Sequence, residues 1–468
     1  MKLIDANEKD FRTLFARCHD VKFETRGGAH LIYCDGMIDA KQLNEHVIPY
    51  IAEMIDNGEL KPIDGQEELR QLERRVFSGS VVIRYPDMRG TKTYETDLAD
   101  PPKRQPEESI SEISIRGPRD GFTEEVSTNV ALIRKRLKTS SLQYEQLIVG
   151  RRGHARIALL YIEDIIDPYF VSEAKRRISR IDVDAVIGCA QLEEYLSDSS
   201  DSIFPLVDTI GRPDFAAESL LRGRFVVLAD GSPMAVIGPS QLMEQLKSPE
   251  DVHSSYYYTI LQRILRLIGL FIAMFLPGFY ISLTCFNIDQ IPFPLLATIS
   301  NARAGIPYPA PIEIMLILGL FELFREAGIR LPKPVGQTVT VVGGLIIGDA
   351  AIRSGLASPS LLMFTAVTAV ASFTLVNQSL TGTVTLLRIY MILISSVLGM
   401  YGFFIGLISV VGYTSTLTSF GTSYWSPIGD LDLKSSILAV FNRPFKSKSK
   451  RPADLHPIDS TSQGERHP

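Results

Sequence analysis

The chain has 468 residues and a formal net charge of −5, with 45% hydrophobic and 22% charged residues. The composition differs between three regions of the chain. Up to about residue 253 charged and apolar residues are mixed, from about 258 to 413 the sequence is strongly apolar, and the remainder is polar. A chain of this length holds about two to four domains. We expect a soluble region joined to a membrane domain, and a net charge summed over both identifies no partner.

The titratable residues form no recognisable catalytic or metal-binding motif. The seven histidines lack metal-ligand spacing, and neither G-x-S-x-G nor H-E-x-x-H occurs. The basic clusters at 151–152 and 175–177 lack the interleaved aromatic residues of nucleic-acid binders. Four cysteines lie far apart without a C-x-x-C pair: Cys18, Cys34, Cys189 and Cys285. We therefore expect no enzyme, metal, cofactor or nucleic-acid partner.

The N-terminal region alternates strand and helix patterns. Its first residues, MKLIDANEKDFRTLF, lack the apolar segment of a signal peptide, so we expect this region to stay in the cytoplasm. Two α/β subdomains are predicted, at 1–100 and 110–253, joined by a linker rich in proline and charge. The patterns predict strands at 30–34 and 80–84, helices at 39–54, 127–137 and 168–180, and a hairpin at 225–237 around Asp230-Gly231.

A short repeat supports two similar subdomains. The segment LIYCDGMID at 31–39 aligns with LLYIEDIID at 159–167, and in both an apolar strand leads through an acidic turn to Ile-Asp at a helix start. Chance similarity is the alternative for so short a match. The turn at 116–125, rich in arginine and glycine, is either an anion site or a hinge held by arginine–carboxylate pairs.

The apolar half predicts a membrane domain at 258–413, with about four crossings plus a re-entrant or interfacial element. Arg263 and Arg266 precede the first crossing, which places the N-terminal region in the cytoplasm by the positive-inside rule. The predicted crossings are 267–286, a short run from 313 to 323, 359–376 and 385–413, with an interfacial segment at 292–304. A polar tail follows at 414–468, and its basic segment 443–452 is expected to face lipid on the cytoplasmic side.

Charged side chains inside the apolar region are candidates for a functional role. A charge at membrane depth is costly and is tolerated where it faces protein or water, as in an ion path or a subunit contact. Glu322 lies on one helix face with Arg325, and we weigh an ion pair at a subunit contact against part of an ion path. The candidate intramembrane charges are Glu313, Glu322, Arg325, Asp349, Arg353 and Arg388. In the last crossing, Gly399, Gly402 and Gly406 form a small-residue stripe suited to helix packing.

The segment 335–348, VGQTVTVVGGLIIG, is too short to span a bilayer and follows a Pro-x-Pro break. Such segments are typical of re-entrant or buried elements near a transport path. The predicted pore or gate residues are Thr338, Thr340, Val341, Val342, Gly343 and Gly344. An uncharged constriction of this kind gates by dewetting.

Several long motifs resemble the A subunit of GerA-type spore germinant receptors. They include FELFREAGIRLPKPVGQTVTVVGGLIIGDAA at 321–351, SEISIRGPRDGFTEEVSTNVALIRKRLK from residue 111, and the shorter YIEDIIDP, IDVDAV, SIFPLVDTIGRPD and LKSPED. The resemblance implies an inner spore membrane protein that works with a transporter-like, nutrient-binding B subunit and a C lipoprotein. It also implies a homo-oligomeric, nutrient-gated channel for monovalent cations. A related sporulation-stage channel protein shares this fold.

The sequence is compatible with two functions. The first is an oligomeric, ligand-gated channel subunit, indicated by the broken and charged stretch 311–351. The second is a non-conducting scaffold that passes the signal to another protein. A secondary transporter is disfavoured because the chain shows no inverted repeat of membrane segments.

Overall fold

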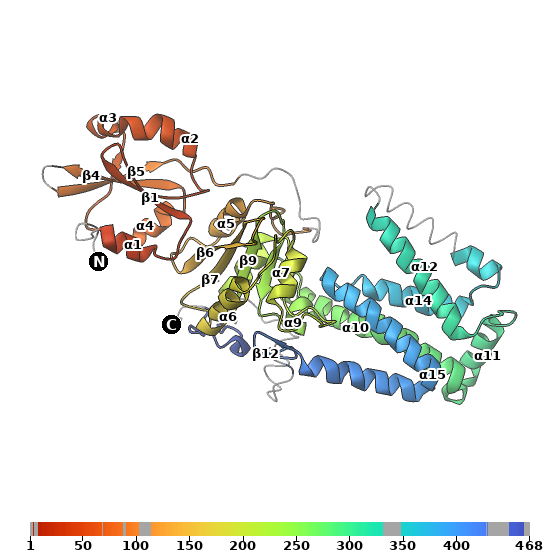
Figure 1. Cartoon of the computed structure of the whole chain (residues 1–468). Helices are drawn as coiled ribbons and strands as arrows, with labels where there is room; N and C mark the ends of the chain where they lie inside the picture. Colours follow the sequence, from red (N-terminus) through yellow and green to blue (C-terminus); the bar gives the residue numbers. More distant parts are fainter. Residues whose placement is uncertain are drawn as a thin grey trace.

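The computed structural model describes residues 3, 8–67, 69–87, 90–102, 114–330, 348–426, 428 and 449–462. Figure 1 shows three parts in a row: a first sheet with short helices, a second sheet with its own helices, and long helices beyond the second sheet. The predicted α/β N-terminal region followed by helices is confirmed at this level.

The first sheet has five antiparallel strands in the order β1-β2-β4-β5-β3. They are β1 (Val21–Arg26), β2 (Ala29–Cys34), β3 (Lys61–Pro62), β4 (Ser80–Asp87) and β5 (Gly90–Asp97). The helices around it are α1 (Glu8–Leu14), α2 (Ala40–Gln42), α3 (Ile51–Asp56) and α4 (Leu69–Val76), with a π-helical turn η2 (Leu43–Val47) and a 3-10 turn η3 (Ile48–Tyr50) between α2 and α3. The predicted start of the helix after Asp39 is confirmed, since its Oδ1 accepts from the backbone N–H groups of Lys41 and Gln42 at 2.9 and 3.0 Å.

The second sheet also has five antiparallel strands, in the order β6-β7-β9-β10-β8. They are β6 (Leu142–Val149), β7 (Ala155–Ile162), β8 (Asp208–Ile210), β9 (Phe225–Ala229) and β10 (Ala235–Gly238). Its helices are α5 (Val126–Arg134), α6 (Pro168–Ser179), α7 (Cys189–Leu196), α8 (Pro213–Leu221), α9 (Leu242–Gln245) and the 3-10 turn η4 (Pro249–Val252). The hairpin predicted around Asp230-Gly231 is the β9–β10 pair.

The two sheets have the same strand order when the strands are numbered in sequence within each sheet. The two repeated segments contain the last residues of β2 and of β7. Each of these strands is the second in the order of its sheet. Asp39 and Asp167, at the ends of the two segments, each cap the helix that follows. Shared topology at the aligned positions supports a repeated unit over chance similarity.

The sheets are joined by a buried ion pair. Arg134 of α5 donates to both carboxylate oxygens of Asp20 at 2.8 and 2.9 Å, with side chains 0% and 6% exposed. Tyr144 N–H also donates to the backbone oxygen of Arg17 at 2.9 Å. Charge-assisted bidentate bonds are directional, so they fix how the first sheet sits on the second.

The hinge interpretation of the turn at 116–125 is supported. Asp120 pairs with Arg136 at 2.6 Å, and the N–H of Arg116 donates to Glu250 of η4 at 2.9 Å. The turn therefore connects α5 to the segment that precedes the long helices.

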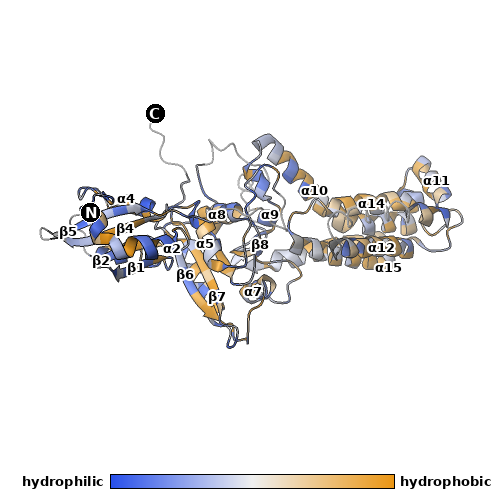
Figure 2. Ribbon diagram, turned by 90° about the horizontal axis from the view of Figure 1, so that it is seen from above, coloured by the Kyte–Doolittle hydropathy of each residue, from blue (hydrophilic) through white to orange (hydrophobic). Residues whose placement is uncertain are grey.

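The helical region comprises α10 (Tyr256–Ile281), α11 (Phe293–Ala302), α12 (Ala310–Arg330), α14 (Pro359–Ser372) and α15 (Gln378–Thr416), with a π-helical turn η5 (Ser282–Phe286) and a 3-10 turn η6 (Ile288–Gln290) after α10. Among the described residues, two stretches are long and apolar enough to cross a membrane: Tyr256–Phe286 and Ser379–Thr416. Figure 2 shows apolar residues concentrated along α12, α14 and α15.

The single helix predicted for 385–413 is wrong, because the chain reverses within α15. Gly399 has φ 61° and ψ −139°, and beyond it the helix folds back as a second arm. The hydroxyls of Tyr390 and Ser409 lie 2.8 Å apart, although a straight helix would separate them by about 28 Å. Gly402 and Gly406 pack against Ile394 and Met391 of the first arm, so the predicted small-residue stripe joins two arms of one hairpin.

The C-terminal segment returns to the second sheet. The short strands β11 (Thr418–Ser419) and β12 (Thr422–Ser423) follow α15, and the 3-10 turn η8 (Ala453–Leu455) lies near the end of the described chain. Phe420 and Leu455 are buried in the core of the second sheet. Arg451 pairs with Asp459 at 2.6 Å and donates to the backbone oxygen of Leu221 at 2.9 Å. The prediction that the basic segment 443–452 faces lipid is therefore wrong for Arg451, which binds protein, and residues 443–448 lie outside the described part of the chain.

Candidate functional site: buried charges in the helices and at their junction with the second sheet

The predicted pore residues lie outside the described part of the chain. Thr338, Thr340, Val341, Val342, Gly343 and Gly344 all fall within 331–347, so their role stays a prediction. All six candidate charges lie in described helices, where they form three separate groups rather than one.

The first group surrounds Glu313, in the first turn of α12. Its side chain is 0% exposed, and Oε1 accepts from the backbone N–H and the hydroxyl of Ser358 at 2.5 and 2.7 Å. Ser358 is the N-cap of α14, where a negative charge is favoured by the helix dipole. Arg303 Nε lies 3.8 Å from Glu313 Oε2, and neither of these two atoms makes a hydrogen bond among the described residues. Glu313 therefore ties the start of α12 to the start of α14.

The second group joins α12 to the first arm of α15. Glu322 pairs with Arg325 at 2.5 Å on its own helix, as predicted, and with Arg388 at 3.2 Å on α15. The hydroxyl of Thr385 donates to the same carboxylate oxygen at 3.3 Å. Arg388 has only 5% of its side chain exposed, so this pair holds a buried charge between two helices.

The two glutamates of α12 face different neighbours. Nine residues separate them, which corresponds to about 13.5 Å along the axis and a rotation of about 180°. The third group, Asp349 with Arg353, is an exposed pair at 2.8 Å. In one copy of the chain, the described charges therefore do not line a common path, and Glu313 and Glu322 instead fix α12 on two sides.

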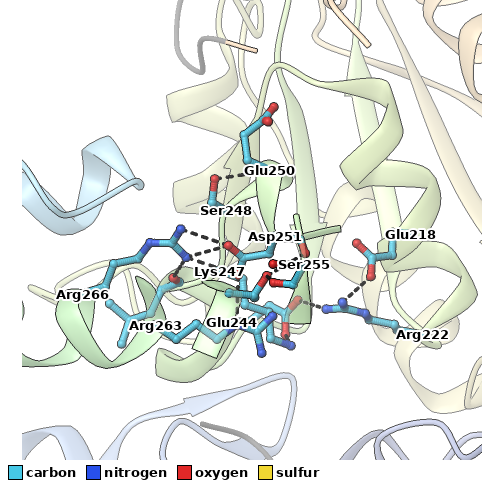
Figure 3. Close-up of polar contacts among 12 residues, drawn as sticks. Glu218, Arg222, Glu244, Lys247, Ser248, Glu250, Asp251, Ser255, Arg263 and Arg266 are labelled. Atoms are coloured by element: carbon cyan, nitrogen blue, oxygen red, sulfur yellow. Dashed lines mark hydrogen bonds and ion pairs between the residues drawn. The ribbon is translucent and has the colours of Figure 1, made fainter. Parts of the chain in front are cut away.

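A further cluster of charges, not predicted from the sequence, lies where α10 leaves the second sheet (Figure 3). Asp251 of η4 is 3% exposed, and its two oxygens accept from Arg263 Nε at 2.9 Å and from the guanidinium of Arg266 at 3.0 Å. Arg266 also donates to the backbone oxygen of Leu246 at 3.1 Å. Both arginines of α10 are thus held by one carboxylate of the soluble region.

Glu244 of α9 is the centre of the adjacent group. It pairs with Lys247 at 2.5 Å, Arg222 at 2.7 Å and Arg224 at 2.8 Å. Burial by itself raises the pKa of Glu244, but Arg224, Lys247 and Arg222 together hold that pKa well below its ordinary value. Burial, with the nearby Arg222 charge, lowers the pKa of Lys247 to about 7. We refer to Asp251, Glu244 and their basic partners as the charged junction.

Sequence reasoning identified only two members of the charged junction. Arg263 and Arg266 stood out as basic residues before an apolar run, but their partner Asp251 lies in a separate turn, at no helical spacing from them. The available signal was the LKSPED motif, which places an acid directly before α10. Among the described residues, no group of three or more His, Cys, Asp or Glu side chains could hold a metal ion.

The geometry defines a class of protein: a repeated α/β unit, linked through a buried charged junction to apolar helices that include two candidate membrane spans. The sequence profile of the Bacillus/Clostridium GerA spore germination protein family matches residues 7–454. This chain belongs to the GerA spore germination protein family, as the sequence motifs predicted.

Curated relatives match over most of their length. Spore germination protein XA of Bacillus anthracis is 40% identical, covering 99% of this chain and 98% of that protein. Spore germination protein GerLA of Bacillus cereus is 38% identical, covering 77% of this chain and 73% of that protein. Spore germination protein KA of Bacillus subtilis (strain 168) is 35% identical, covering 77% of this chain and 66% of that protein.

Among solved structures, the N-terminal domain of the A subunit of the Bacillus megaterium spore germinant receptor GerK3 covers 52% of this chain and 98% of that chain. It is 20% identical and aligns with a TM-score of 0.39.

Proposed function

We propose that this protein is the A subunit of a nutrient-sensing spore germinant receptor, and that several copies associate into a nutrient-gated channel for monovalent cations. Membership in the GerA family and full-length similarity to spore germination proteins support the receptor role. The complex would include the B subunit, which binds the nutrient, and the C lipoprotein, in the inner spore membrane.

The observation that carries the membrane role is the reversed distribution of side chains in the helical region. Val397, Tyr401 and Phe373 are 74%, 71% and 70% exposed, whereas Glu313 and Arg388 are 0% and 4% exposed. Large apolar side chains outside and charges inside suit helices that face lipid or further copies.

We infer a multi-span arrangement with both flanking regions on the cytoplasmic side. The start of α10 and the segment that follows α15 both contact the subdomain of the second sheet, through Asp251 of η4 and through the hydrogen bond from Ser419 of β11 to Leu206. Of the described helices, α10, α12, α14 and the two arms of α15 are the candidate crossings. Flanking regions on one side require an even number of full crossings, so these five candidates are not the exact set: either one of them does not span, or residues outside the described part add another.

The channel is tested by changing the size of the predicted gate. Spores that carry this receptor as their only one, with Val341→Ala or Val342→Phe, are exposed to a nutrient mixture that activates the unsubstituted receptor. We expect the smaller side chain to leak cations without nutrient and the larger one to slow their release. Ile458→Ala, at a position 60% exposed and outside the helical region, is the control and should leave release unchanged.

A non-conducting scaffold, the alternative function, makes the opposite prediction. If both gate variants reach the membrane in normal amounts and release cations as the unsubstituted receptor does, conduction belongs to another subunit. Reconstitution in liposomes with the partner subunits then shows whether flux needs this chain. The related sporulation-stage channel is distinguished by timing, since it would act while spores form and not when nutrient arrives.

A further inference from the structure

One segment of the second sheet's subdomain contacts both arms of the α15 hairpin. The backbone oxygen of Ile203 accepts from the hydroxyl of Thr383, in the first arm, at 2.5 Å. The backbone N–H of the same residue donates to the hydroxyl of Tyr413, in the second arm, at 3.1 Å. Ile203 thus bridges the two arms of the hairpin, at two residues that are 30 positions apart in the sequence.

Five residues later, a buried side-chain pair joins the sheet to the turn before α15. Asn377 Nδ2 donates to Asp208 Oδ1 at 2.7 Å, and the two residues are 8% and 6% exposed. Asp208 is the first residue of β8, which among the described strands pairs with β10 alone and so forms an edge of the second sheet. Asn377 also caps α15 through Oδ1, which accepts from the N–H groups of Ser379 and Leu380.

The apolar side chains between these points are divided between two cores. Phe204 and Leu206 belong to the apolar cluster of α10 and α15, whereas Val207 belongs to the core of the second sheet. The backbone oxygens of Pro205 and Leu206 accept from Gln245 at 2.5 Å and from Ser419 at 2.6 Å. These contacts fix residues 203–208 to β8 of the second sheet, to the α15 hairpin, and to α9 and β11 beside them.

We propose that residues 203–208, the coupling segment, transmit movement of the second sheet to the α15 hairpin. The charged junction holds the sheet on α10, so any displacement of β8 changes the position of α15 relative to α10. A short edge strand is easier to displace than a central one, because only one ladder of hydrogen bonds holds it. The inference deepens the proposed function, on which its role in gating rests.

The Asn377–Asp208 pair allows the segment to be uncoupled without removing the helix cap. Asn377→Asp keeps the oxygen that caps α15 but replaces the amide donor with a second carboxylate oxygen, which faces Asp208. Adding Asp208→Asn restores a donor and an acceptor in reversed positions. The double variant therefore tests the pair itself and not either residue alone.

Hydrogen exchange of the purified full-length chain in detergent tests the physical coupling. In Asn377→Asp we expect amides of β8 and of the first turn of α15 to exchange about tenfold faster, and the double variant to recover most of this. Faster exchange at α15 alone, or no recovery in the double variant, overturns the coupling. No nutrient or ion is needed, so this result judges the segment even if the channel proposal fails.

Nutrient-triggered cation release from spores tests the role in gating. We expect Asn377→Asp to change the rate of release about tenfold and the double variant to return it to within about threefold. Thr383→Val, which removes one bond to the segment, should act in the same direction. Thr368→Val, a matched control, loses only a bond within α14 and should have no effect. Unchanged release in Asn377→Asp and Thr383→Val, each at normal membrane amounts, overturns the proposal.

Discussion

The charged junction makes a quantitative prediction about how the second sheet is held on α10. In Asp251→Ala, the guanidinium groups of Arg263 and Arg266 lose their shared carboxylate while remaining buried. The two side chains are each only 10% exposed, so water replaces few of the lost bonds.

The magnitude follows from the number and environment of these contacts. Asp251 accepts charge-assisted bonds from both arginines at 2.9 to 3.2 Å, and breaking a buried pair by removing one partner typically costs about 3–5 kcal/mol. For a cooperative unit the size of the second sheet and α10, this corresponds to a decrease in Tm on the order of 10 °C.

The protein's single tryptophan reports on this unit. Trp425 is partly buried, donates from Nε1 to Thr414 at 2.9 Å, and packs against the cluster that contains Leu246, whose backbone oxygen accepts from Arg266. Thermal unfolding of the full-length chain in detergent, followed by tryptophan emission, therefore reports on the unit that the junction holds together.

A matched control separates burial from ion pairing in general. Asp182 pairs with Arg151 at 2.5 Å, but both side chains are well exposed, so Asp182→Ala should leave Tm unchanged. Equal shifts in Asp182→Ala and Asp251→Ala, or no shift in either, would refute the reasoning. Replacing Asp251 and both arginines together by apolar residues should recover most of the stability, because no buried charge is then left unpaired.

Three more predictions use the same unfolding assay. Burial raises the pKa of Glu193 from 4.5 to about 7, so its folded carboxylate costs stability that grows as pH rises from 4.5 and is complete above 7. Glu193→Gln should therefore stabilise the chain at pH 8, by at most about 3 kcal/mol, and have little effect near pH 4. Gly399→Ala would place a methyl group 2.6 Å from a neighbouring ring at positive φ and should cost about 2–4 kcal/mol, whereas Gly412→Ala meets no atom within 4 Å and should not destabilise. Leu455→Ala empties a fully buried site and should cost about 2–5 kcal/mol, whereas Ile458→Ala, 60% exposed, should change Tm little; equal effects would place the C-terminal segment outside the core.

The soluble half could be largely predicted because its signals are local. Each signal acts over a few residues. The signals are an aspartate before an apolar helix face, an Asp-Gly turn between apolar segments, and a repeated strand–turn pattern. Asp39, Asp167 and the Asp230-Gly231 hairpin all occur in the structure as the sequence indicated.

The helical half was harder because its decisive contacts are between distant segments. Gly399 was interpreted as part of a packing stripe in one helix, since small residues at a spacing of three to four also suit helix contacts. Its positive φ, which makes the turn, is not visible in hydropathy. In the same way, helical spacing predicted that Glu322 pairs with Arg325 on the same helix. Its second partner, Arg388, lies far away in the sequence and is brought to Glu322 by the fold.

The return of the C-terminal segment to the second sheet has a consequence for how the protein is made. Phe420 and Leu455 fill the same core as residues of β7 and β9, although more than 190 residues separate Phe420 from the end of β9. The first sheet contains all its own strands within the first 97 residues and is complete early in synthesis. All strands of the second sheet precede the helices of the helical region in the chain, but its core receives Phe420 and Leu455 only after every one of those helices has been synthesised, so the last part of its packing comes from the end of the chain.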